Sequence, residues 1–162
     1  MSAPSRPSRN VWRPRTMWAL AAVCMLCPAD AAAQRLELSV TPASISFPSA
    51  DPDVTPTIAA APVVVSIRIR QSSGPWQLTV LANGDLMSGG ETVDITNVAW
   101  TATPVPPFQN GTLSRTVAQR MASGTGNVNP TQNGSVVFRL ANSWNYAAGT
   151  YTQTLVFTLS AP

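Results

Sequence analysis

The chain has 162 residues, with ten arginines, seven acidic residues, two cysteines, no lysine and no histidine. Without histidine or lysine, neither a nucleophile–histidine–acid triad nor lysine Schiff-base chemistry can be built. Four arginines and one acid lie in the first 33 residues, which leaves six of each in the remainder. That remainder lacks the basic patch of a nucleic-acid-binding domain, so we expect no nucleic-acid partner.

Residues 1–33 have the pattern of a secretory signal peptide. Four arginines precede an apolar run from Met17 to Cys27, and Ala31-Ala32-Ala33 supplies the small residues that signal peptidase requires. This apolar run is shorter than the roughly 20 residues of a membrane-spanning helix. We therefore expect cleavage before Gln34, and a secreted protein of the periplasm, the cell surface or the exterior. A lipoprotein start at one of the two cysteines is the alternative.

The mature chain, residues 34–162, is expected to form one domain without disulfides, because both cysteines lie in the leader. Apolar and polar residues alternate in several segments, which predicts strands with one buried face. The segments are Leu36–Val40, Ile45–Phe47, Val63–Arg70, Trp76–Leu81, a weaker Glu91–Trp100, Thr112–Ala118 and Ser135–Leu140.

Turn chemistry separates these segments. The prolines and aspartates of residues 48–62 predict a loop or an edge crossing. Ser72-Ser-Gly-Pro75 predicts the tight turn of a hairpin that places Trp76 and Leu78 inward. The Gly, Asn, Ser and Thr of residues 122–134 predict a mobile loop.

The closing segment is the most regular in the chain. After the turn at Ala147-Ala148-Gly149, one face carries Tyr151, Leu155, Phe157 and Leu159, and the other carries threonines and Val156. Seven to eight short strands and no amphipathic helix favour an all-β fold, an Ig-like antiparallel β-sandwich, with an antiparallel barrel as the alternative.

The residue types of the mature chain argue against catalysis, metal centres and cofactors. It contains no histidine or cysteine for zinc, and no glycine-rich phosphate cradle between a strand and a helix. A glycosidase needs a pair of carboxylates, and Asp51, Asp53 and Asp85 are more simply explained as turn formers. We expect no enzyme activity, no catalytic residues, no metal site and no cofactor.

Aromatic residues form the remaining candidate site. Trp76 is in phase with Leu78 and Val80, so we assign it to the core. Trp144 and Tyr146 border a turn and are the preferred ligand-binding residues, as a stacking platform for sugar rings.

Two segments resemble the WxL domain of bacterial cell-surface proteins. The first is Trp76-Gln77-Leu78, preceded by Gly74-Pro75, and the second runs from Gly149-Thr-Tyr151 to Phe157-Thr-Leu159, with Phe157 at the position of the family's Trp. This resemblance implies non-covalent attachment to peptidoglycan.

The same closing segment is similar to the end of spore-coat-U-type and other chaperone–usher pilin subunits. That resemblance implies an Ig-like sandwich and subunits that lend an N-terminal strand to a neighbour, here Leu36–Val40. We therefore expect a non-catalytic structural or adhesion protein of the bacterial cell surface or envelope. Its partners are cell-wall or matrix polysaccharide, or other surface-protein subunits; a pilin-like fibre subunit and a secreted polysaccharide-binding module are the alternatives.

Overall fold

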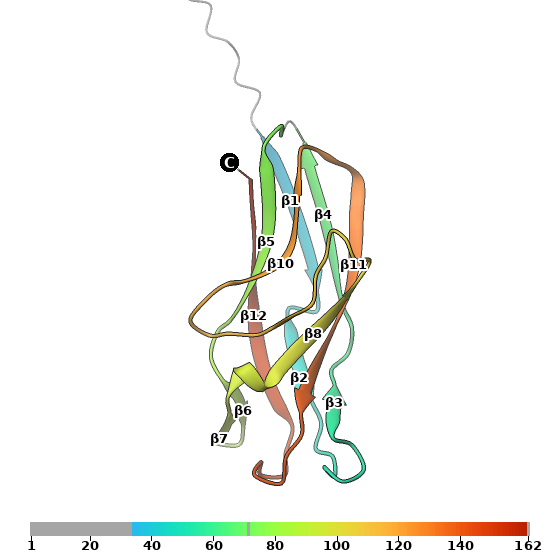
Figure 1. The fold of residues 1–162 in the computed structure, drawn as a ribbon. Helices are drawn as coiled ribbons and strands as arrows, with labels where there is room; N and C mark the ends of the chain where they lie inside the picture. Colours follow the sequence, from blue (N-terminus) through green and yellow to red (C-terminus); the bar gives the residue numbers. More distant parts are fainter. Residues whose placement is uncertain (1–33, 71, 162) are drawn as a thin grey trace, which may run out of the picture. The chain divides into compact units, whose positions relative to one another are not determined.

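The structure, a computed structural model, describes residues 34–70 and 72–161, so the signal peptide expected at residues 1–33 lies outside the described residues. The described residues form twelve β-strands, eight of them four residues or longer, and every pairing between strands is antiparallel. The strands make two sheets that pack against each other around a shared apolar core (Figure 1). The expected all-β sandwich is confirmed.

The first sheet contains six strands: β1 (Arg35–Thr41), β3 (Thr57–Ala59), β4 (Val63–Arg70), β8 (Val98–Thr103), β9 (Gly111–Thr112) and β11 (Val128–Ala141). Their order is β1–β4–β11–β8–β9, with β3 paired to the end of β11. In β4, Val63, Val65, Ile67 and Ile69 are fully buried, and the residues between them face outward. The period-2 alternation of the sequence therefore decides which face of this strand packs on the core.

The second sheet also contains six strands: β2 (Ser44–Phe47), β5 (Pro75–Ala82), β6 (Leu86–Ser88), β7 (Glu91–Val93), β10 (Gln119–Thr125) and β12 (Tyr151–Ser160). Their order is β10–β5–β12–β6–β7, with β2 also paired to β12. Trp76 and Leu78 are buried, as expected for core residues. Leu78 lies directly opposite Leu159 of β12, so the two segments that carry the WxL resemblance occupy neighbouring strands.

The hairpin expected across Ser72–Pro75 is wrong. β4 pairs with β1 and β11, whereas β5 pairs with β10 and β12, so the connection carries the chain from one sheet to the other. Alternation along a strand specifies which face is inward, but it does not specify the neighbouring strand.

The mobile loop expected at residues 122–134 is also wrong, because most of this segment belongs to β10 and β11. Two of its glycines lie beneath aromatic rings. A Cβ on Gly124 would come within 2.7 Å of the Trp76 ring, and one on Gly134 would collide with the Phe108 ring. Glycine is required here because a ring lies on the backbone, which is a known use of glycine inside strands.

Three further segments differ from expectation. The strand expected over Thr112–Ala118 is limited to β9, because the Ser114 hydroxyl accepts from the backbone N–H of Thr116 and Val117 and forms a turn. The segment of residues 48–62, expected as a loop or an edge crossing, contains the short strand β3. The strand expected over Glu91–Trp100 is divided by η1 (Ile95–Asn97), a 3₁₀ turn.

Asp94 explains that division. Its carboxylate accepts from the backbone N–H of Thr96 at 2.8 Å and caps η1. This backbone hydrogen bond, followed by the one from the Thr96 hydroxyl, lowers the pKa of Asp94 below its ordinary value. The carboxylate therefore serves the local turn.

The closing strand β12 is paired differently along its two halves. β6 and β5 pair with one side of the strand, and β2 pairs with the other side over Tyr151–Thr154 only. The backbone N–H of Leu155 donates to the carbonyl of Ala43, and no strand of the described residues pairs with this side beyond that point. Because polar groups alternate along an antiparallel strand, the N–H and C=O groups of Phe157 and Leu159 face this open side.

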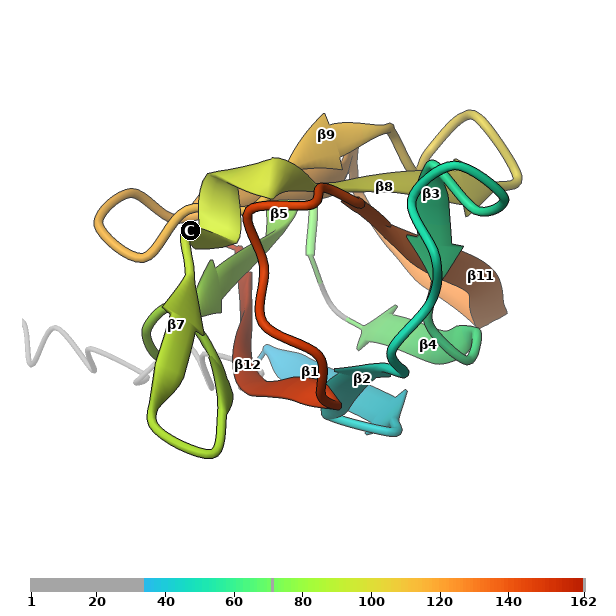
Figure 2. The same cartoon turned by 90° about the horizontal axis from the view of Figure 1, so that it is seen from below.

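The open side of β12 faces β1. Figures 1 and 2 both place β1 next to β12, and among the described strands β1 pairs with β4 alone. The chain changes sheets between β1 and β2 at Pro42, which has no N–H to donate to a ladder. Leu38 and Val40 of β1, and Phe157 and Leu159 of β12, are only partly buried against the core. The apolar core is therefore only partly covered between β1 and β12.

Candidate functional site

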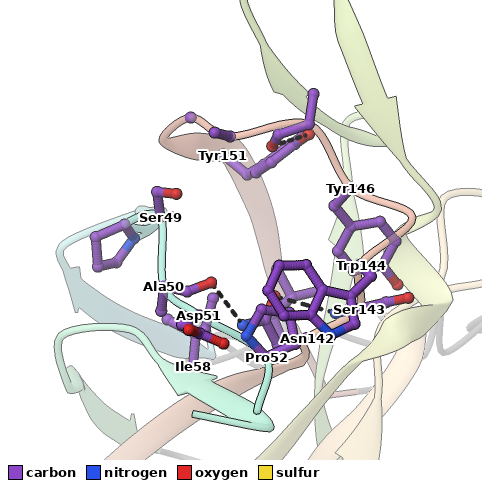
Figure 3. A pocket seen from close by; sticks show the side chains of 15 residues that line it. Ser49, Ala50, Asp51, Pro52, Ile58, Asn142, Ser143, Trp144, Tyr146 and Tyr151 are labelled. Atoms are coloured by element: carbon purple, nitrogen blue, oxygen red, sulfur yellow. Dashed lines mark hydrogen bonds between the residues drawn. The ribbon is translucent and has the colours of Figure 1, made fainter. Parts of the chain in front are cut away.

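A cavity of about 260 Å³ lies at one end of the sandwich (Figure 3). It is lined by the loop of residues 48–56, which joins β2 to β3, and by the loop of residues 142–150, which joins β11 to β12. Figure 3 shows Ser49, Ala50 and Asp51 on one side of the cavity and Trp144 and Tyr146 on the other. The two aromatic residues chosen from the sequence therefore line one cavity.

Trp144 is the most exposed aromatic side chain of this cavity, with 68% of its surface accessible. The indole is nevertheless held in place, because its Nε1–H donates to Oδ1 of Asp53 at 3.2 Å. Asp51 shapes the loop that carries Asp53: its carboxylate accepts from the backbone N–H of Asp53 at 2.9 Å, and its carbonyl accepts from that of Thr55 at 2.7 Å. The turn-forming role expected for these aspartates is confirmed, and it positions an acceptor for the indole.

Asn142 joins the two loops. Its Nδ2 donates to the carbonyls of Ala50 and Thr55, both at 3.0 Å, and its backbone N–H donates to the carbonyl of Pro56 at 2.9 Å. Sequence reasoning missed this residue. Its only signal was an asparagine directly after a strand, which does not reveal partners about 90 residues away in the chain.

Tyr146 and Tyr151 also line the cavity. Their rings meet edge to face, with centroids 6.4 Å apart, and the Tyr151 hydroxyl donates to the carbonyl of Ala147 at 3.0 Å. Burial, followed by the negative charge of Asp94, raises the pKa of Tyr146. The Tyr146 hydroxyl therefore stays protonated, and can donate a hydrogen bond, throughout the neutral pH range.

The electrostatic character of the cavity is acidic. Asp51 is one of its lining residues, and Asp53 contacts Trp144. The ion pairs of the described residues join Arg35 and Arg68 to Glu37 and Arg115 to Asp85, so neither cavity aspartate belongs to one. No group of three or more potential metal ligands occurs within the described part of the chain.

The other motif residues lie away from this cavity. Trp76 is only 4% exposed, between two open hollows at the opposite end of the second sheet. Leu78 is fully buried, and Phe157 and Leu159 are partly buried on β12. These residues contribute to packing, and the structure does not bring them together with Trp144 and Tyr146.

The sequence matches no protein-family model, and comparisons with curated proteins and with solved structures find no match either. Within the residues that the structure describes, no helix has the length and apolar character needed to cross a membrane.

Proposed function

We propose that this chain is a secreted, non-catalytic protein of the cell surface or envelope, with a structural or adhesive role, that joins other surface-protein subunits through the open side of β12. The observation that carries this proposal is the unpaired side of β12 beyond Leu155, next to the unpaired side of β1. Two strand edges with free backbone groups, and apolar side chains between them, are the features that accept an added strand from another chain.

The side chains at this opening support the proposal. Phe157 and Leu159 belong to the inward face of β12 but stay partly exposed, as do Leu38 and Val40 of β1. A strand added along the open side of β12 would cover Phe157 and Leu159 and bond their free N–H and C=O groups. The burial of these side chains and the new backbone hydrogen bonds come from a single partner strand, and they are the usual source of affinity in strand addition.

A second candidate is a pilin-like fibre subunit, in which β1 is the strand that is lent. β1 follows the expected cleavage site directly, and within the described part of the chain β4 is the one strand that pairs with it. In this arrangement β1 leaves β4 and occupies the open side of the next subunit. Repetition of such a head-to-tail contact produces an open fibre.

The experiment uses the full chain, secreted by its host, with the N-terminus of the product determined by sequencing. Multi-angle light scattering over a concentration series reports self-association, and negative-stain microscopy reports fibres. We expect association in the secreted chain and its loss when Phe157→Lys and Leu159→Lys place charges at the opening. The matched control is Val156→Lys and Thr158→Lys, which places the same charges on the outer face of the same strand.

Removal of residues 35–41 separates the two candidates. If the fibre forms because each subunit lends β1 to its neighbour, the chain without residues 35–41 forms only discrete particles. If another strand is the partner of β12, association persists. A chain that stays monomeric at all concentrations, and recovers no envelope protein on cross-linking in its host, contradicts both.

A further inference from the structure

We infer that the cavity at the loop end binds a single uncharged sugar ring, stacked on the indole of Trp144. This inference does not rest on the contact proposed for β12. The cavity is formed by the loops at one end of the sandwich, whereas the open side of β12 begins beyond Leu155 and runs toward the opposite end (Figure 1).

Trp144 is both exposed and fixed in place. An indole with 68% of its surface exposed is unfavourable in water unless something covers it. Its Nε1–H is already bonded to Asp53, so the ring is fixed before any ligand arrives and its faces are left for contact. A fixed aromatic face loses little conformational entropy when a flat apolar surface stacks on it.

Polar groups line the same cavity, among them Asp51 and Tyr146. The Asp51 carboxylate uses Oδ1 to accept from Asp53, which leaves Oδ2 as an acceptor. Tyr146 keeps its proton at neutral pH and is a donor. A sugar ring presents C–H groups on its face and hydroxyls at its edge, so it matches a cavity whose lining combines an exposed indole with one acceptor and one donor.

The charged side chains at the cavity are negative. Asp51 lines the cavity and Asp53 holds its platform, while the arginines of the described ion pairs are bonded to Glu37 and Asp85. Taking an anionic ligand into this site would place like charges together, which is unfavourable. The site therefore selects uncharged sugars over uronic acids and sulfated or phosphorylated glycans.

The volume of the cavity limits the size of its ligand. The cavity volume of about 260 Å³ lies below the roughly 300–1,000 Å³ of pockets that enclose drug-sized ligands. It has room for one ring, with the rest of a glycan outside. Asn142 and its bonds to Ala50 and Thr55 keep the two loops at this separation.

The test measures binding of three uncharged trisaccharides to the secreted chain: cellotriose, maltotriose and triacetylchitotriose. Trp76 and Trp100 are 4% and 2% exposed, so the fluorescence that acrylamide can quench comes from Trp144. At least one trisaccharide is expected to shift Trp144 emission to the blue and to protect it from acrylamide. Calorimetric titration then supplies the affinity.

Variants locate the site. Trp144→Ala should weaken binding about tenfold or more, and Trp144→Phe should weaken it less because a smaller stacking face remains. Val117→Ala is the control, since Val117 is also exposed but lies in the loop between β9 and β10. Asp51→Asn should weaken the preference for cellotriose over trigalacturonate, because it removes a negative charge and keeps an acceptor.

Three results would overturn the inference. One is that none of the uncharged trisaccharides binds. Another is that Trp144→Ala binds as tightly as the unchanged chain. The third is that choline or trigalacturonate binds more tightly than every uncharged trisaccharide, which would identify a cation site or an anion site instead.

Discussion

The two halves of β12 have the same alternating sequence and different surroundings. From Tyr151 to Thr154 the strand has neighbours on both sides, and Tyr151 and Leu155 are buried. From Phe157 to Ser160 it has a neighbour on one side only, and Phe157 and Leu159 are partly exposed. Burial of an apolar side chain therefore depends on whether a second strand covers it, and the pattern in the sequence does not record this.

The largest effect is expected when the whole strand is removed. β12 is the only link among the described residues between β5 and β2, and it carries Tyr151 and Leu155 of the core. Deletion of Tyr151–Pro162 should abolish cooperative unfolding, as followed by circular dichroism during denaturant titration. A truncated chain that still unfolds in one sharp transition would contradict the central position of this strand.

The next largest effect is expected to differ between the two halves of β12. Leu155→Ala should lower the free energy of unfolding by about 2–5 kcal/mol, the range for a fully buried leucine. Leu159→Ala should lower it by about half as much, because part of this side chain already contacts water. Both losses are measured by urea unfolding, and equal losses would show that the second half is covered in solution. Val156→Ala, on the exposed face, is the control.

The smallest effect concerns the start of the strand. Tyr151→Phe removes only the hydrogen bond from the Tyr151 hydroxyl to the carbonyl of Ala147 and keeps the ring contact with Tyr146. We expect a loss of about 0.5–1.5 kcal/mol in the free energy of unfolding. A loss as large as that of Leu155→Ala would mean that this bond also holds the loop of residues 142–150 in its fold.

The predictions that succeeded concern single strands. The inward positions of β4 and of the start of β5 were predicted from alternation alone, and the turn-forming role of Asp51 was predicted from its residue type. Those that failed concern neighbours. The hairpin between β4 and β5 was wrong because strand pairing is a choice between partners far apart in the sequence. Residues 122–134 were misassigned because Gly124 and Gly134 are covered by rings from elsewhere in the chain.

In the candidate site, too, local patterns were predicted and contacts between distant residues were not. Trp144 and Tyr146 were chosen from the sequence because aromatic residues beside a turn suggest a platform, and the structure places both at one cavity. Asp53 and Asn142 were not chosen, although one holds the indole and the other ties the loops together. Each acts on a residue about 90 positions away in the chain, and a local pattern cannot report such a contact.

The sequence by itself determined that this chain is built of strands and which side chains of most strands face inward, because side chains alternate with a period of two. It also determined the residue types available for chemistry, with no histidine and no lysine. Only the tertiary structure decided which strands are neighbours, that β12 is open along one half, and that two distant loops enclose a cavity beside Trp144. The physical reason is that a strand's backbone groups can pair with many partners, and the choice is made by packing of the whole core.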